Sequence, residues 1–168
     1  MRWMRAAGKY DQSPSARKVA TIWVDALVKF PTFHMKTKHY LTHEDVKMIL
    51  GACEAHAVAN KWAVCISIVD DGGHLQGFLR LDGAAPASVE ISQGKAYSAA
   101  VRRRPTKGDE EMVNNGRVSA LSMPGITFLE GGVPIVTHGE TIGAVGVSGV
   151  KSSEDAEVAA AGIAALGL

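Results

Sequence analysis

Two pairs of short apolar runs, each joined by a turn of only a few residues, constrain the fold of this chain more than any other feature. The first pair is 62–70 (WAVCISIVD) and 74–81, with two glycines between them. The second lies within 126–150, where Gly131-Gly132 and His138-Gly139 mark turns between two or three strands. Strands joined by a tight turn run antiparallel, because a parallel crossover needs a dozen or more residues. The sequence therefore predicts an antiparallel sheet, not a doubly wound one.

A first helix is predicted directly before these strands. Apolar residues recur at helical spacing from Val46 to Ala57, on a face that extends to about Asn60. Thr42, followed three residues later by Asp45, resembles a capping box with Asp in place of the usual Glu. The helix therefore begins near Thr42 and presents one apolar face to the sheet.

Three more helical segments follow the first hairpin. Pro86 opens a helix over 86–103 that is crowded with Ser, Gly and Ala, and a short helix is predicted over 108–115. Ser152, with Asp155 three positions on, predicts the cap of a last, alanine-rich helix. Helices packed on an antiparallel sheet give an α/β chain of the α+β class.

The first 34 residues differ from the rest in charge and pattern. They hold six Lys and Arg against two Asp, a net charge of +4, which leaves −3 for the remainder of a chain whose total is +1. Apolar residues recur there at helical spacing over 15–30. We interpret 1–34 as an N-terminal extension and 35–168 as the main domain. The extension is a loosely attached arm, a segment upstream of a natural start at Met35, or an arm that packs on a neighbouring subunit.

Composition argues against several classes of protein. A net charge of +1 provides no general field for nucleic acid. No apolar run approaches the roughly 18 residues that span a bilayer, and no secretory cleavage site follows the apolar stretch 19–30. We therefore expect a cytoplasmic protein with no membrane partner. Cys53 and Cys65 lie twelve positions apart among apolar residues, which predicts buried free thiols.

The glycine-rich run 143–149 (GAVGVSG) is the first candidate for a binding surface. Its spacing is not that of the dinucleotide fingerprint GxGxxG, and it lies inside a strand instead of a strand-to-helix turn. Glycines within a strand let either another backbone or a ligand approach closely. Gly146 and Ser148 therefore belong to the floor of a ligand site, or the glycines mark close packing against the second helix.

Charged residues near strand and helix ends supply candidate ligand contacts. Arg80 and Asp82 point to the same side of a continuing strand, where they form a surface pair or face a pocket together. Glu130 precedes the Gly131-Gly132 turn at the edge of an apolar strand, and the two glycines are either a simple turn or further ligand contacts. Lys95 lies in the middle of the small-residue helix, so its amine extends into solvent or reaches along the helix to the sheet. We predict that Lys95 and Glu130 share one cleft, with at least one of them buried, and act there in acid–base chemistry.

None of the six histidines shows a metal-binding spacing such as HExxH, so no metal site is predicted. His56 differs from the others in its placement, three residues after Cys53 and seven after Ile49. That spacing puts it on the buried face of the first helix. It is either a hydrogen-bonded core residue or an axial ligand of haem iron.

Two long, ordered motifs resemble the GlcG/HbpS-like family. The first is V-D-D-G-G-H-L-x-G-F-x-R-L-D-G-A-x-P-x-S at 69–88, followed by G-K-A-Y-S-A-A at 94–100. The second is G-G-V-P-I-x-x-x-G-x-x-I-G-A-V-G-V-S-G at 131–149. The C-terminal domain of the PduO-type adenosyltransferases belongs to the same group. The resemblance covers about 41–167.

The resemblance implies an antiparallel five-stranded sheet flanked by helices, similar to profilin-like folds, and a homo-oligomer, often an octamer. Some members bind haem, one type as an extracellular redox-sensing accessory protein and another within a cobalamin-related enzyme. Others are encoded beside genes for small-acid or aromatic catabolism. A first-helix histidine binds haem in the PduO-type domain, and His56 is its match here. The secretion signal of the extracellular members has no counterpart among the motifs of this chain.

Two functions follow as hypotheses. The first is a haem-binding accessory or sensor protein with His56 as iron ligand, although aromatic residues make up only 6% of the chain. The second is an enzyme of organic-acid or aromatic catabolism, acting by isomerisation, proton transfer or hydrolysis on a small molecule. In that enzyme Arg80 and Lys95 would hold carboxylates and Glu130 would move a proton. A third, structural hypothesis is an oligomeric scaffold.

Overall fold

The computed structural model describes residues 35–168, so the predicted helix over 15–30 lies outside the described residues. Helices and strands follow one another in the predicted mixed α/β order. They are α2 (His43–Ala59), β1 (Cys65–Asp70), β2 (Leu75–Arg80), α3 (Ser88–Arg102), α4 (Lys107–Asn114), the 3-10 helix η1 (Val118–Ser122), β3 (Gly132–Thr137), β4 (Glu140–Ser148) and α5 (Ser152–Ala164).

The strands pair antiparallel in the order β2-β1-β4-β3, as their tight turns predicted. The prediction of a fifth strand is wrong for the described part of the chain, which holds a four-stranded sheet. The segment directly before β3 lies against α3 instead of joining the ladder. There the backbone N–H of Thr127 donates to Ser98 Oγ over 2.8 Å. A side chain of α3 therefore takes the hydrogen bond that a neighbouring strand would have supplied.

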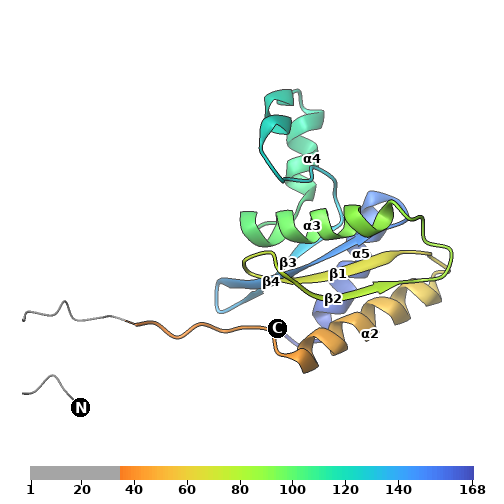
Figure 1. Cartoon of the computed structure of the whole chain (residues 1–168), viewed down its shortest axis with the longest axis vertical. Coiled ribbons are helices and arrows are strands. Elements are labelled where there is room, and N and C mark those ends of the chain that lie inside the picture. The colour runs from red at the N-terminus through yellow and green to blue at the C-terminus, as the bar shows by residue number, and fades with distance from the viewer. Residues whose placement is uncertain (1–34) are drawn as a thin grey trace, which may run out of the picture. The chain divides into compact units, whose positions relative to one another are not determined.

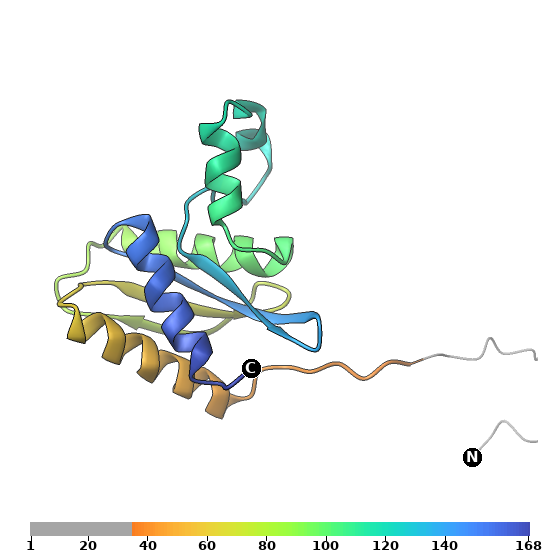
Figure 2. The same ribbon diagram turned by 180° about the vertical axis from the view of Figure 1, so that it is seen from behind.

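Helices cover both faces of this sheet, with α2 and α5 on one face and α3 on the other (Figures 1 and 2). The face under α2 and α5 holds the larger core. Its fully buried members are mostly branched aliphatic side chains, including Ile49, Ile66, Ile68, Ile135, Val145, Val147 and Val158. Burying each such side chain contributes about 1.5–3 kcal/mol. This face therefore supplies most of the apolar driving force for folding.

The opposite face is thin because α3 packs through small side chains. Ala96, Ala99 and Ala100 lie against Val69 and Ala144, and the hydroxyls of Ser67 and Ser92 are 2.8 Å apart. The helix backbone consequently approaches β4 so closely that a Cβ on Gly146 would overlap the Ser92 carbonyl oxygen and the Ala96 nitrogen. For Gly146 the structure thus supports close packing against α3, while Gly143 and Gly149 lie against Leu41 and Ala63.

The helix starts confirm one predicted cap and correct another. At α2, the Asp45 N–H donates to Thr42 Oγ1 (3.2 Å) and the Thr42 N–H donates to the Asp45 carboxylate (2.8 Å), as expected for a capping box. At α5, the prediction of Ser152 as the cap is wrong. The capping residue is Lys151, whose backbone N–H donates to the Glu154 carboxylate over 3.1 Å. Asp155 cannot serve the cap of Ser152, because its carboxylate is buried in the protein interior.

Between α3 and β3, α4 and η1 form an excursion that stands away from the sheet (Figure 1). Its helix was predicted at 108–115 and lies at 107–114. Asp109 is fully buried and anchors α4 to the end of α3 through ion pairs with Arg102 (2.9 Å) and Arg104. Across the described residues, no helix combines the length and apolarity needed to cross a membrane.

Candidate functional site

His56 lies one turn before the end of α2, at the edge of the buried face that helical spacing predicted. Its side chain is 28% exposed, and its Nε2 is 3.1 Å from a carboxylate oxygen of Glu157 on α5. The imidazole therefore sits in the seam where α2 packs against α5, reachable from solvent and held by one carboxylate.

Trp62 adds an aromatic wall to this region. Its ring centroid lies 5.9 Å from that of His56, with the planes tilted by 53°. The chain reaches this position because Asn60 caps the C-terminal end of α2 and Lys61 adopts a positive φ of 60°, which reverses the backbone toward β1. Sequence reasoning missed Trp62. The signal for it was a large aromatic residue placed directly after a predicted helix end.

A surface depression of about 420 Å³ is lined in part by Trp62. Its lining combines apolar and charged side chains, among them Glu54, Val58, Lys61, Trp62, Leu81 and Asp82. Asp82 is thus part of a pocket lining, whereas the predicted alternative was a pocket that Arg80 and Asp82 face together. Arg80 does not share that pocket, because its guanidinium donates to the carbonyl oxygen of Ala84 through Nη2 (2.6 Å) and Nε (3.2 Å).

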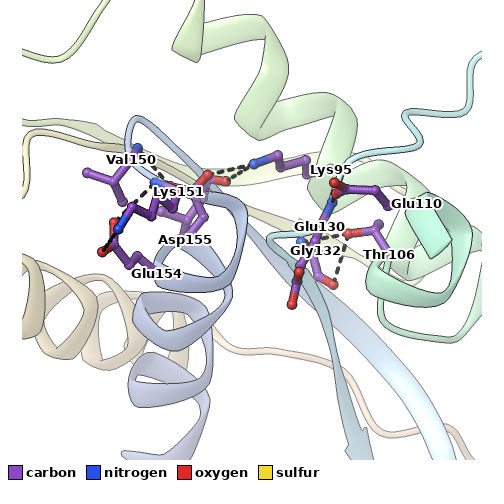
Figure 3. Close-up of polar contacts among 10 residues, drawn as sticks. Lys95, Thr106, Glu110, Glu130, Gly132, Val150, Lys151, Glu154 and Asp155 are labelled. Atoms are coloured by element: carbon purple, nitrogen blue, oxygen red, sulfur yellow. Dashed lines mark hydrogen bonds and ion pairs between the residues drawn. The ribbon is translucent and has the colours of Figure 1, made fainter. Parts of the chain in front are cut away.

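Lys95 is buried, but its partner was not predicted. The amine donates to Asp155 Oδ2 over 2.7 Å and to the carbonyl oxygen of Val147 over 3.0 Å (Figure 3). It passes the start of β3, where a Cβ on Gly131 would lie only 2.8 Å from Nζ. Burial raises the pKa of the Asp155 carboxyl, and the hydrogen bond and charge of Lys95 oppose that rise. The amine is thereby enclosed by groups of the fold itself.

Glu130 takes part in a different set of contacts. Its carboxylate is 3.5 Å from Lys107 Nζ, and its backbone N–H donates to the Glu110 carboxylate (Figure 3). Within residues 35–168, no ion pair or hydrogen bond joins Glu130 to Lys95. The two residues are close in space through Gly131, yet each has its own partners. Their predicted joint chemistry stays a prediction.

The remaining predicted ligand contacts lie in packed regions. A Cβ on Gly132 would overlap the Lys95 backbone, and Gly146 faces α3 as described above. Ser148 is buried at the end of β4. A ligand at Gly132 or Gly146 would have to displace α3, so the small size of these two residues serves helix–sheet contact.

Both cysteines lie in the interior of the described part of the chain. Cys53 and Cys65 are free and buried, as predicted. Burial raises the pKa of the Cys53 thiol to about 12, so it stays protonated at neutral pH. Among residues 35–168, no three His, Cys, Asp or Glu side chains are grouped to hold a metal ion.

A sequence model of the family described as "Haem degrading protein HbpS-like" matches residues 41–164. The chain belongs to the HbpS-like family. Protein GlcG of Escherichia coli (strain K12) is 52% identical to it over 114 residues, which cover 68% of this chain and 85% of GlcG. The family match and the similarity to GlcG confirm the resemblance of the two sequence motifs to the GlcG/HbpS-like family.

Solved structures of HbpS-like proteins share the fold. A doubly substituted HbpS from Streptomyces reticuli is 28% identical, with a TM-score of 0.75 over 84% of this chain and 97% of that one. The complex of PduOC with haem is 25% identical, with a TM-score of 0.70 over 76% of this chain and 95% of that one. The fold of this family therefore accommodates haem in at least one relative.

Proposed function

We propose that this chain binds haem and that His56 is its iron ligand. The observation that carries the proposal is the setting of His56, a solvent-reachable imidazole beside the Trp62 ring in the α2–α5 seam. A porphyrin needs a nitrogen ligand for its iron and apolar surface for its ring. The haem complex of the relative PduOC supports the same ligand class.

The ring nitrogens of His56 fit this role. No side chain or backbone group among the described residues hydrogen-bonds to Nδ1, and Nε2 is held by Glu157, whose side chain is 58% exposed. An exposed carboxylate can rotate away from Nε2 without leaving a buried charge unpaired. If iron binds through Nδ1, Glu157 instead orients the ring, as carboxylates do beside metal-bound histidines. Bound haem would supply the redox and ligand-exchange chemistry of its iron.

The finer role is a haem-binding accessory or sensor protein that works as a homo-oligomer, an octamer. Exposed apolar side chains on β2 and α3 support association: Leu75, Phe78, Tyr97 and Val101. In the alternative enzyme, Arg80 and Lys95 would hold carboxylates and Glu130 would move a proton. That hypothesis receives no support from the position of the Lys95 amine, which Asp155 and Val147 enclose.

Haem titration of the purified protein, followed at the Soret band, tests the proposal. We expect His56→Ala to weaken binding by more than about tenfold, because the iron loses its protein ligand. His43→Ala is the matched control, since His43 is an exposed histidine in the first turn of the same helix. Equal affinity of the wild type and both variants would contradict the assignment of His56.

A further inference from the structure

The depression beside Trp62 is separate from the His56 surface, although the two share the Trp62 ring. Glu54 and Val58, one helical turn apart, line it on the flank of α2 that faces the end of β2. His56 lies between them in sequence and projects to the other flank, where it contacts Glu157 of α5. A ligand in the depression therefore would not occupy the proposed iron ligand.

The charged side chains around this depression are more negative than positive, and none of them takes part in an ion pair among residues 35–168. Glu54 and Asp82 contribute two carboxylates and Lys61 one ammonium group. Throughout residues 35–168, the ion pairs within 4 Å include none of these three side chains. Two free carboxylates beside one cation give the site a net negative charge, which favours a cation over an anion.

The apolar part of the lining selects the kind of cation. Val58, Trp62 and Leu81 form much of the surface, and none of them is a ligand for a hard metal ion, which requires several oxygen donors. An indole ring attracts an organic ammonium group through its quadrupole, and tryptophan is the strongest of the aromatic residues in this interaction. A compact alkylammonium group satisfies both the ring and the carboxylates.

We propose that this depression binds a small organic cation, with its ammonium group near Trp62 and the carboxylates of Glu54 and Asp82. The volume of about 420 Å³ suits a compact molecule of this kind. The depression shares only Trp62 with the proposed haem surface and does not include His56, so choline binding and haem binding are tested separately.

Calorimetric titration of the full-length protein with choline, at constant ionic strength, tests this site. The matched probe is 3,3-dimethylbutan-1-ol, which has the shape of choline without its charge. We expect choline to bind saturably and the neutral probe to bind at least about fivefold more weakly. Absence of saturable choline binding, or equal binding of the two probes, would overturn the proposal.

Variants locate the binding within the molecule. The double variant Glu54→Gln/Asp82→Asn, at two exposed positions, should weaken choline binding about tenfold. The control Glu90→Gln, which removes an exposed carboxylate on α3, should leave choline binding unchanged. Trp62→Leu should weaken binding about fivefold, with the circular dichroism spectrum as the check on folding. Unchanged affinity in the double variant would place any choline binding elsewhere and contradict the proposed site.

Discussion

Lys95 and Asp155 form an ion pair with almost no contact with solvent, since their side chains are 3% and 2% exposed. Two charges removed from water are costly unless each is satisfied. Here the pair is completed by the Val147 carbonyl, which accepts from Lys95, and by the Val150 N–H, which donates to Asp155 over 3.2 Å. This residue pair ties α3 to α5 around the end of the sheet.

Removal of one partner should therefore be severe. We predict that Lys95→Met lowers the free energy of unfolding by about 3–5 kcal/mol, because it leaves the Asp155 carboxylate buried without a counter-charge. Helix propensity alone would have predicted a small cost at this position. Urea unfolding monitored by circular dichroism measures the change.

The double variant Lys95→Met/Asp155→Leu controls for lost packing. It should recover most of the stability, because replacing both ions by apolar groups removes the unpaired charge. If Lys95→Met lowered the free energy of unfolding by less than about 1 kcal/mol, the prediction that Asp155 depends on Lys95 as its counter-charge would be wrong.

At the scale of the element, the contact between α3 and β4 depends on a missing side chain. Gly146 lies where the helix backbone meets the strand. We predict that Gly146→Ala destabilises the protein by about 1–3 kcal/mol or more, because the added Cβ overpacks a fixed backbone contact. Thermal unfolding provides the measurement.

Gly51 is the matched control for that substitution. It lies within α2, and a Cβ there meets no atom within 4 Å. Gly51→Ala should stabilise the protein by about 0.5–1 kcal/mol through helix propensity. If both alanines had the same effect, the close approach of α3 would not be the reason for the glycine in β4.

The β1–β2 hairpin has an acid-sensitive turn. Asp70 accepts hydrogen bonds from the backbone N–H groups of Gly72 (2.8 Å) and His74 (2.9 Å). Burial raises the pKa of Asp70, but these bonds and the His74 ring outweigh it and hold the pKa below its ordinary value. The stability that the carboxylate contributes is therefore present above its unfolded pKa of about 3.9 and is lost as pH falls through the folded value.

Asp70→Asn should accordingly be destabilising at pH 6, and the difference from the wild type should shrink as the pH falls below about 4. Urea midpoints at a series of pH values measure this difference. A difference that stays constant from pH 6 to pH 3 would show that the turn does not depend on the charge of Asp70.

Sequence reasoning succeeded in these elements where the signals are local. The tight turns fixed the antiparallel pairing, and the Thr42–Asp45 box fixed the start of α2. It failed where a contact depends on segments that are distant in sequence. The Asp155 carboxylate pairs with an amine 60 positions away, and the segment before β3 contacts Ser98 instead of a strand. Trp62 and the Asp109 anchor were missed although their contacts are closer in sequence. Each follows a backbone reversal at a residue with positive φ, Lys61 and Arg103, that helical and strand patterns do not predict.

At the scale of the whole molecule, exposed apolar side chains on β2 and α3 favour association with further copies of the chain. The small residues of α3 face the sheet and are buried, among them Ser92, Ala96 and Ala99, so they offer no surface for association. The exposed apolar surface is supplied by larger side chains on β2 and α3, such as Leu75, which is 52% exposed. Exposed apolar patches of this kind mark association surfaces.

We predict a closed homo-oligomer larger than a dimer, measured by light scattering at micromolar concentration. Phe78→Asp should reduce the mass, because it introduces a charge into the exposed apolar surface of β2. A wild-type protein that remains monomeric under these conditions would refute the prediction. The division into an extension over 1–34 and a domain over 35–168 also stays a prediction.

The central claim, that His56 binds haem iron, is tested most directly by chemical rescue. The visible spectrum of haem-loaded His56→Gly is recorded with and without added imidazole, which can take the place of the missing side chain. We predict that the variant lacks the wild-type Soret maximum and that imidazole restores it. A variant that shows the wild-type spectrum without imidazole would contradict the claim.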